Sequence, residues 1–350
     1  MKKVKLGQLV SIQTGKLDAN EAVPGGKYPF FTTAKEISCI NEYAYDDEVV
    51  LVAGNGDLNV KYYKGKFNAY QRTYILTSNS NVRMKYLYYF LDKYIEVLRY
   101  QSIGGVIKYI KLNNLSDAQI PMRSTIEQDK IIRILEKLDN EIIIRNKQLS
   151  ELSNLVKSRF NEMFGDFYTT LFPKYKIGEK FELSSGSTPS RDNKLYWDSG
   201  TINWVKTTEV INKEITETEE KITKFALENT SLKLFPVNTI LIAMYGQGQT
   251  RGRSAILKVE STSNQACGAI FPNKIDNPVF IWHQLMLRYS ELRELGRGGN
   301  QPNLNGQLIK NFELIFPPLS LQNEFADFVA QVDKSQFACQ KAIKLWRNSL

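Results

Sequence analysis

The sequence "IPMRSTIEQDKIIRILEKLDNEI" at residues 120–142 has the pattern expected where a domain ends and a long helix begins. Ser124 or Thr125 is a good N-cap, and a Glu or Gln follows two to three positions later. A weaker copy, "FPPLSLQNEFADFVAQVDKSQ", begins at residue 316. Because the chain contains the same helix start twice, we infer an internal repeat.

Further matches support this repeat along the whole chain. "VKLGQLVSIQTG" pairs with "YKIGEKFELSSG", which places Gly7 on Gly178 at an offset of 171. The offset rises steadily and then holds at 194, the value that places Gln128 on Gln322. The common order of the matches indicates two copies of one unit. The second copy holds about 20 extra residues in its N-terminal half, including "INKEITETEEK", and such length differences are typical of loops or recognition surfaces.

Each copy has an α/β pattern. Short β-branched runs, "EVVLVAG" at 48–54 and "NTILIAMYG" at 238–246, predict strands. Longer apolar stretches at 82–100 and 279–295 predict helices, each ending at a pair of glycines. The fold class is therefore α/β, with two globular α/β domains in a pseudo-twofold repeat.

A long helix closes each copy. The first is expected to run to about Phe164, since Gly165 is a plausible C-terminal stop. Apolar residues spaced three and four apart form a heptad seam, interrupted by Arg145 and Arg159. The two seams include Leu135, Leu138, Ile142, Leu149 and Leu152 in the first helix, and Val329, Val332, Ile343 and Trp346 in the second.

We expect these two seams to pair with each other as an antiparallel coiled coil. At ~1.5 Å per residue the first helix would be about 60 Å long, whereas a domain of ~120 residues is about 30 to 40 Å across. The alternative is that each helix packs only on its own domain. The expected organisation is a globular domain at 1–123, a helix at 124–165, a second domain at 166–316 and a helix at 317–350. That second helix stops at a position corresponding to Val156, about two turns short of its counterpart.

The composition limits the classes of function. Hydrophobic residues make up 42% and charged residues 24% of the chain, no run of about 18 apolar residues occurs, and the N-terminus lacks the features of a signal peptide. We therefore expect a cytoplasmic protein without a membrane partner. The three cysteines lack CxxC spacing and His283 is the single histidine, which argues against disulfides and against a zinc site. His283 itself is expected to pack within a helix.

The motifs that resemble enzyme sites are incomplete. "FPPL" at 316–319 is similar to the Asn/Asp-Pro-Pro-aromatic box of amino-methyltransferases, but Phe316 stands where a polar residue would hold the target amine. "GQGQTRGRS" at 246–254 has the glycines of a phosphate loop, but with the wrong spacing and Arg in place of Lys. We therefore expect no catalytic residues, although a single-chain methyltransferase or nuclease is kept as a rival.

Polar, glycine-rich loops with basic and aromatic residues recur in both copies, and the net charge of +9 favours a polyanionic partner. Glycine lets a backbone approach a groove, while Arg, Lys, Gln and Asn can contact phosphates and base edges. The candidate DNA-binding residues of the first loop set are Asn55, Lys61, Tyr62 and Lys64, opposite Tyr245, Gln247, Gln249, Arg251 and Arg253. Those of the second set are Gly104, Gly105 and Lys108, opposite Arg297, Gly298, Asn300 and Gln301, and the third set is Thr207 and Thr208.

These features together resemble the specificity subunit of Type I restriction-modification systems. The resemblance is carried by "SSGSTPSR" with "YWDSGTINWVKTTEV", by "QPNLNGQLIKNFELIFPPLSLQNEFADFVAQVD", and by the mid-chain "IPMRSTIEQDKIIRILEKLD". It covers essentially the whole chain, although the first copy matches only loosely.

The resemblance implies two target recognition domains, each binding one half of an asymmetric, bipartite duplex DNA site, with conserved spacer helices between them. It implies two modification subunits as partners, which methylate adenine N6 with S-adenosylmethionine. Restriction subunits that use ATP and Mg²⁺ can add to that complex. This chain would then carry neither catalysis nor a cofactor. A stand-alone bipartite DNA-binding protein without enzyme partners is the alternative.

Overall fold

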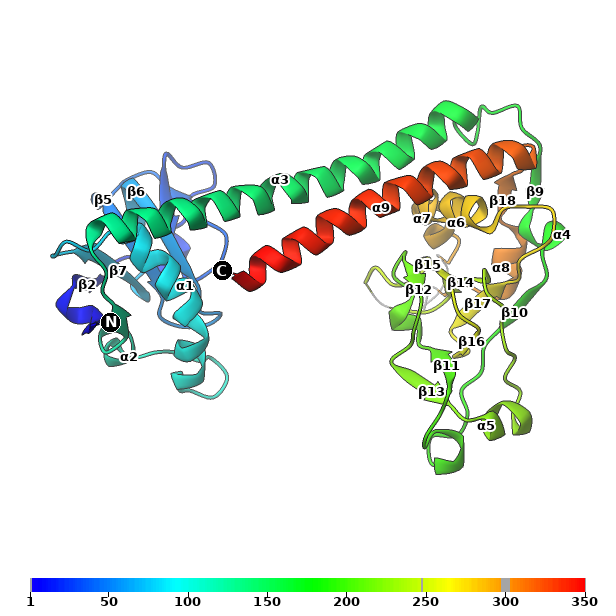
Figure 1. Ribbon diagram of the computed structural model, residues 1–350, viewed down its shortest axis with the longest axis horizontal. Coiled ribbons are helices and arrows are strands. Elements are labelled where there is room, and N and C mark those ends of the chain that lie inside the picture. Colours follow the sequence, from blue (N-terminus) through cyan, green and yellow to red (C-terminus); the bar gives the residue numbers. More distant parts are fainter. Residues whose placement is uncertain (1, 247, 297–302, 350) are drawn as a thin grey trace. The chain divides into compact units, whose positions relative to one another are not determined.

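The computed structural model describes residues 2–246, 248–296 and 303–349. The chain divides into two compact units, a first unit of Met1–Ile144 with Lys344–Leu350 and a second unit of Arg145–Ile343. Figure 1 colours the chain along the sequence and labels its helices and many of its strands. In the described ranges, no helix combines the length and the apolar composition needed to cross a membrane.

The first unit is built on a six-stranded sheet with the order β2-β7-β5-β6-β3-β4, in which β3 and β6 are parallel and the other pairs are antiparallel. A separate two-stranded sheet joins β1 to β8. The strands are β1 (Lys3–Lys5), β2 (Val10–Thr14), β3 (Tyr28–Phe31), β4 (Ser38–Ile40), β5 (Tyr45–Ala53), β6 (Val60–Ala69), β7 (Thr73–Ser78) and β8 (Gln119–Pro121). The α-helices are α1 (Met84–Gln101) and α2 (Leu112–Ser116), and short 3₁₀ helices lie at Leu6–Gln8 and Ala19–Glu21.

The predicted strand at 48–54 is the centre of this sheet and is buried on both faces. On one face Val50 and Val52 join the core beneath α1. On the other face Val49 and Leu51 pack in a smaller cluster with Phe67. A strand covered on both sides has the continuous apolar run seen here rather than strict alternation.

The second unit repeats this plan in separate sheets, a five-stranded one of order β10-β17-β14-β15-β12, a three-stranded one of order β13-β11-β16, and the pair β18-β9. Its strands are β9 (Lys174–Lys176), β10 (Leu183–Ser185), β11 (Ile202–Val205), β12 (Glu214–Ile215), β13 (Glu220–Ile222), β14 (Ile240–Ala243), β15 (Ser254–Leu257), β16 (Ser261–Ser263), β17 (Cys267–Ile270) and β18 (Glu313–Ile315). Its helices are α4 (Ile177–Lys180), α5 (Lys224–Asn229), α6 (Pro278–Leu287), α7 (Tyr289–Glu294) and α8 (Gly306–Asn311), with 3₁₀ helices at Lys194–Tyr196 and Thr207–Glu209.

Glycines that mark the repeat are required by the same contact in both copies. A Cβ on Gly15 would lie 2.1 Å from the carbonyl oxygen of Ala69, and a Cβ on Gly186 would lie 2.1 Å from that of Ser263. Ala69 and Ser263 are themselves separated by the repeat offset of 194. The predicted internal repeat is therefore confirmed by equivalent backbone contacts.

The two long helices are α3 (Thr125–Phe164) and α9 (Leu319–Ser349). Ser124 caps α3, because its hydroxyl accepts from the Glu127 amide at 3.3 Å while the Glu127 carboxylate accepts from the Ser124 amide at 3.0 Å. The helix ends before Gly165, which has φ +74° and donates from its amide to Asn161 at 2.8 Å. The expected start and stop of the first long helix are both confirmed.

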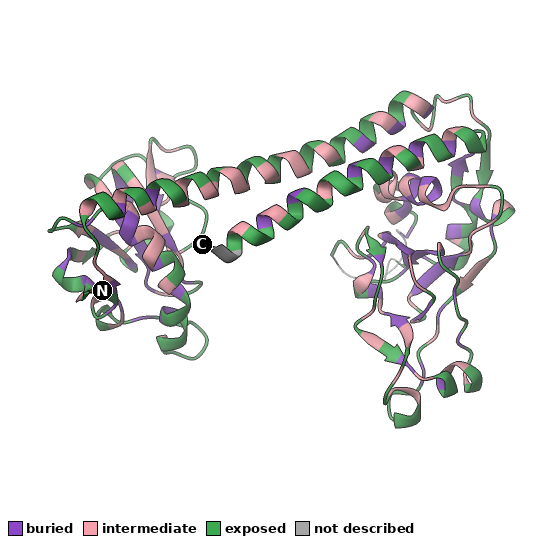
Figure 2. Cartoon of the chain, viewed as in Figure 1, coloured by how far each residue is buried: buried purple, intermediate pink, exposed green. Residues whose placement is uncertain are grey.

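Burial along both long helices follows the heptad seams predicted from the sequence. In α9, Val329, Val332 and Ile343 are buried and Trp346 is half-buried. In α3, the seam positions Leu135, Leu138, Ile142, Leu149 and Leu152 are half-buried along a single stripe. Figure 2 shows this alternation of buried and exposed positions along both helices.

The second unit contains direct contacts between α3 and α9. Arg159 donates to Glu324 at 2.8 Å, and Gln336 donates to Ser153 at 3.2 Å. Residue numbers fall along α3 as they rise along α9, so the helices are antiparallel. The expected pairing of the two seams is confirmed there. Arg159, which interrupts the apolar seam of α3, forms ion pairs with both Glu162 and Glu324.

The expectation of one continuous helix at 279–295 is wrong. The helix breaks at Arg288, whose backbone has φ −102° and ψ +25°, and α7 begins at the next residue. The Arg288 guanidinium stacks 3.5 Å from the centre of the Phe167 ring and bonds the Glu291 carboxylate at 2.6 Å. The contact with Phe167 is long-range and leaves no periodic signal in the helix itself. His283 on α6 is packed as expected, and burial lowers its pKa to about 4.

A buried glutamine attaches each globular fold to its long helix. Gln322 accepts from the Asn277 amide at 2.8 Å, at the start of α6, and donates to the carbonyl of Pro317 at 2.9 Å and to Asp276 at 3.0 Å. Gln128 makes the equivalent bonds in the first unit, accepting from the Arg83 amide at the start of α1 and donating to a carbonyl, both at 2.9 Å. Both glutamines are 1% exposed.

Replacing Gln322 with leucine should destabilise the protein. The change keeps the side-chain volume but removes the bonds to the Asn277 amide, the Pro317 carbonyl and Asp276, which costs about 3 kcal/mol. The matched control is Gln331→Leu, because Gln331 is exposed on the same helix and surface changes stay within about 0.5 kcal/mol. Urea unfolding of both variants measures the difference; equal midpoints would contradict the assignment.

Candidate nucleic-acid interface

In the first unit, the loop between β5 and β6 lies beside the segment that follows α1. The Gly56 amide donates to the carbonyl of Lys108 at 2.8 Å, and Asn55 forms a β-bridge with Tyr109. The segment closes on itself because Ile103 and Tyr109 exchange two main-chain bonds of 3.0 and 2.9 Å. The first and second predicted loop sets are thus brought together here.

A cavity of about 550 Å³ opens between these two segments and the edge of the sheet. Its lining is mixed, with two side-chain amides, a guanidinium, phenol rings and main-chain groups. The lining residues are Thr14, Gly54, Asn55, Gln71, Arg72, Tyr74, Ile107, Tyr109 and Ile110. Groups of these types match the donors and acceptors on base edges and phosphates.

Three of the predicted residues on β6 lie elsewhere. The Lys61 ammonium donates to the carbonyl of Ala34 at 2.6 Å, and burial lowers its pKa. Tyr62 donates to Glu48 at 3.0 Å, and burial together with this carboxylate raises the pKa of Tyr62 to about 12. Lys64 is exposed and lies 3.7 Å from the same carboxylate. The structure therefore does not bring Lys61, Tyr62 or Lys64 to the cavity that Asn55 lines.

In the second unit, the loop between β14 and β15 carries the remaining predicted residues of the first set. Tyr245 and Gln249 are exposed, and Arg253 is half-buried with its guanidinium 2.7 Å from the Gln249 side chain. Arg251 points inward and is 9% exposed. Of this loop, Tyr245, Gln249 and Arg253 are thus the predicted residues placed to meet a ligand.

The third predicted set is divided. Thr207 is buried, and its hydroxyl donates to the Asn264 side chain at 2.8 Å, so this hydroxyl is bonded within the protein. Thr208 is exposed. The predicted residues Gln247, Arg297, Gly298, Asn300 and Gln301 lie outside the described residues.

Comparisons with known proteins decide the family. The family model described as "Type I restriction modification DNA specificity domain" matches residues 1–154 and again 171–345. The chain belongs to this family. The two matched segments correspond to the two copies inferred from the sequence, so the repeat is a repeat of the specificity domain.

Individual relatives agree. A 161-residue stretch is 38% identical to the Type I restriction enzyme EcoDI specificity subunit of Escherichia coli, covering 46% of this chain and 36% of that protein. The EcoR124I/EcoR124II specificity subunit of Escherichia coli is 25% identical over 288 residues, or 77% of this chain and 68% of the relative. The sequence prediction of membership in the family of Type I specificity subunits is confirmed.

The fold is also known. The crystal structure of the Type I restriction-modification S subunit from M. genitalium superposes with a TM-score of 0.65 at 17% identity, covering 99% of this chain and 92% of that one. This likeness confirms the predicted architecture of two α/β domains with long helices.

Sequence reasoning missed part of the surface of the first specificity domain. Gln71 and Arg72 are exposed and line the cavity, although neither was among the predicted DNA-binding residues. Val106 is 103% exposed and Ile107 is 61% exposed, at the tip of the closed segment. Two adjacent apolar side chains within a glycine-rich loop could have indicated this surface from the sequence. Apolar side chains in DNA-binding proteins contact the thymine methyl group or enter between base steps.

Across the described ranges, no group of three or more His, Cys, Asp or Glu side chains is placed to hold a metal ion.

A second cavity of the first unit, about 480 Å³ in volume, lies between β6, α1 and α3. It is lined by Tyr62, Lys85, Tyr88, Tyr89, Glu136, Asp139 and Asn140.

The two glycines of the closed segment at 103–109 should respond differently to replacement by alanine. Gly104 has φ +111°, and a Cβ there would lie 2.4 Å from the carbonyl oxygen of Ile107. A Cβ on Gly105 would meet no atom within 4 Å, and the backbone of Gly105 is not in the left-handed region. Gly104→Ala should therefore open the segment and speed proteolysis within 103–109, whereas Gly105→Ala should match the wild type. Equal cleavage rates for both variants would count against the closed segment.

Proposed function

We propose that this chain is the DNA specificity subunit of a Type I restriction-modification complex, in which each unit binds one half of a bipartite duplex site. The observation that carries the proposal is the double match to a DNA specificity domain in a chain whose two copies each present an exposed loop between equivalent strands. One domain per half-site is the economical use of such a repeat. DNA binding by the named side chains is part of this proposal.

The surface chemistry supports DNA as the ligand. The chain carries a net charge of +9, and Arg72 and Lys108 are exposed beside the cavity of the first unit. Within the described part of the chain, neither of these two cations has a carboxylate partner. Cations that are not neutralised by the protein can replace counterions on phosphates. In the second unit, the polar side chains of the corresponding loop are Arg253 and Gln249, which are hydrogen-bonded to each other.

The proposed partners follow from the family. Two modification subunits would bind the chain and supply S-adenosylmethionine-dependent methylation of adenine N6. Restriction subunits with ATP and Mg²⁺ would add cleavage. The antiparallel pair of α3 and α9 would set the number of base pairs between the half-sites. The chain itself would contribute recognition and no catalytic group.

Salt-dependent DNA binding tests the proposal. The chain is purified with a co-expressed modification subunit and titrated with its target duplex at several salt concentrations. Arg72→Ala, Lys108→Ala and Arg253→Ala should each weaken binding and reduce the slope of log K against log salt by about 0.9 for every phosphate that the removed side chain neutralises. Lys93→Ala is the control, because Lys93 is exposed on α1 and does not line the cavity.

Three outcomes separate the alternatives. Unchanged affinity and slope in all three variants would refute DNA contact by these side chains. Equal affinity and selectivity of the isolated chain would instead favour a stand-alone bipartite DNA-binding protein. Methylation or cleavage by the isolated chain would favour the enzyme rival.

A further inference from the structure

One arginine in each unit occupies the same place in the repeat. Arg99 lies in the last turn of α1 and Arg293 lies in the last turn of α7. Their numbers differ by 194, which is the repeat offset in this part of the chain. Both side chains extend to the loop between equivalent strands, β5–β6 in the first unit and β14–β15 in the second.

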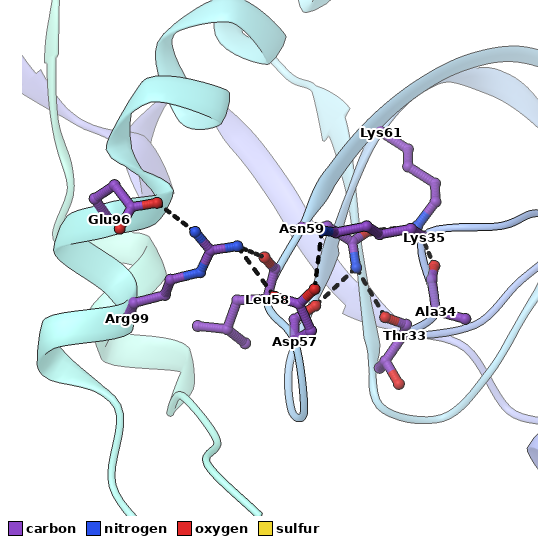
Figure 3. A network of polar contacts seen from close by, with 9 residues as sticks. All are labelled: Thr33, Ala34, Lys35, Asp57, Leu58, Asn59, Lys61, Glu96 and Arg99. Atoms are coloured by element: carbon purple, nitrogen blue, oxygen red, sulfur yellow. Dashed lines mark hydrogen bonds and ion pairs between the residues drawn. The ribbon is translucent and has the colours of Figure 1, made fainter. Parts of the chain in front are cut away.

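In the first unit, Arg99 fastens the loop to α1 (Figure 3). Its Nη2 donates to the main-chain carbonyl of Leu58 at 2.8 Å and to the Asp57 carboxylate at 3.1 Å. Glu96 accepts from the other terminal nitrogen and so orients the guanidinium. On the opposite side of the loop, Lys35 lies 3.2 Å from the same Asp57. The loop is therefore held from both sides.

In the second unit, Arg293 fastens the equivalent loop in the same way. Its Nη1 donates to the carbonyl of Arg251 at 3.1 Å, and its Nη2 donates to the carbonyl of Gly248. Tyr289, one turn earlier on α7, donates from its hydroxyl to the carbonyl of Gln249 at 2.7 Å. One guanidinium and one phenol thus hold three parts of the loop by its main chain.

The acceptors explain how one device can serve two different loops. The loop sequences, "GNGDLN" at 54–59 and "YGQGQTRGR" at 245–253, share almost no side chains. Main-chain carbonyls are present whatever the side chains are. A bond from a charged donor is roughly twice as strong as one between neutral groups. The planar fork of arginine can reach two acceptors at once, which the single ammonium of lysine does not reproduce.

We propose that Arg99 and Arg293 are positioning residues, each fixing the recognition loop of its own unit and so controlling the affinity for one half-site only. The proposal rests on the proposed function, because it assumes that these loops contact DNA. A loop ordered before binding loses less conformational entropy when the complex forms. The side chains displayed by each loop can then differ while the geometry that presents them is kept.

The experiment uses the full chain with its modification subunit. Arg99→Ala and Arg293→Ala are compared by hydrogen exchange of the two loops and by affinity for three duplexes, the intact target and two probes with one half-site replaced. Arg293→Ala should speed exchange in 244–253 but not in 54–59, and lower affinity for the intact target about 10- to 100-fold. Arg293→Ala should bind the intact target and the probe that lacks the half-site of the second unit with equal affinity. It should still bind the probe that lacks the other half-site more weakly than the intact target. Arg99→Ala should give the mirror-image result.

Two further variants separate positioning from direct contact. Arg293→Lys keeps the charge without the fork, so it should behave like Arg293→Ala if the side chain positions the loop. Tyr289→Phe removes the hydroxyl that donates to the carbonyl of Gln249 and accepts from Arg293, while Arg293 keeps its own bonds to the loop, so the effect should be smaller and confined to the same loop and the same half-site. Because this substitution removes only a hydroxyl group, it still tests the proposal if the alanine variant is unstable.

The results that would overturn the proposal are specific. Faster loop exchange with unchanged half-site discrimination would make the arginines structural only. Unchanged exchange, restored affinity in Arg293→Lys and a salt slope reduced by about one in Arg293→Ala would make Arg293 a phosphate contact. If the wild-type complex does not distinguish the three duplexes, the proposed function fails, while the exchange data still test whether each arginine holds its loop.

Discussion

One buried glutamine in each copy joins its domain to its long helix by hydrogen bonds. Gln128 and Gln322 accept from the amide of the N-cap residue of a domain helix and donate to a carbonyl of the segment that leads into a long helix. A buried polar side chain of this kind is costly unless every partner is in place. These bonds therefore fix the start of each long helix to its own domain.

From that fixed attachment outward, the structure separates constant from variable parts. The strands, the glycines at close backbone contacts and the domain helices recur at matched positions. The additions in the second copy include β12 and α5, which have no counterpart among the described elements of the first unit. The loops between β5 and β6 and between β14 and β15 differ in sequence and length, yet both are held through their main chains. Such a division lets recognition change without redesigning the core.

Sequence reasoning recovered what depends on local periodicity and on self-similarity. The repeat, the cap at Ser124, the stop at Gly165 and both heptad seams were predicted because each leaves a pattern within a few turns of chain. The break at Arg288 was not, since the contact of its guanidinium with the distant Phe167 ring leaves no local pattern in the sequence. The inward direction of Arg251 and of Thr207 was missed for the same reason, because a loop residue's burial is set by its tertiary neighbours. The exposed tip at Val106 carried a weak signal that composition alone did not isolate.

The central claim is that two copies of one domain bind separate half-sites at a spacing set by the helix pair. Removing residues 145–151 and 336–342 together deletes one heptad from facing stretches of α3 and α9 and preserves both seams. The loss of seven residues shortens the pair by about 10 Å at ~1.5 Å per residue, close to three base pairs at ~3.4 Å each. Methyl-adenine mapping in a host expressing the chain with its modification subunit gives the recognised motif directly. The account predicts unchanged half-sites and a gap about three base pairs shorter, whereas an unchanged gap or a single contiguous motif would contradict it.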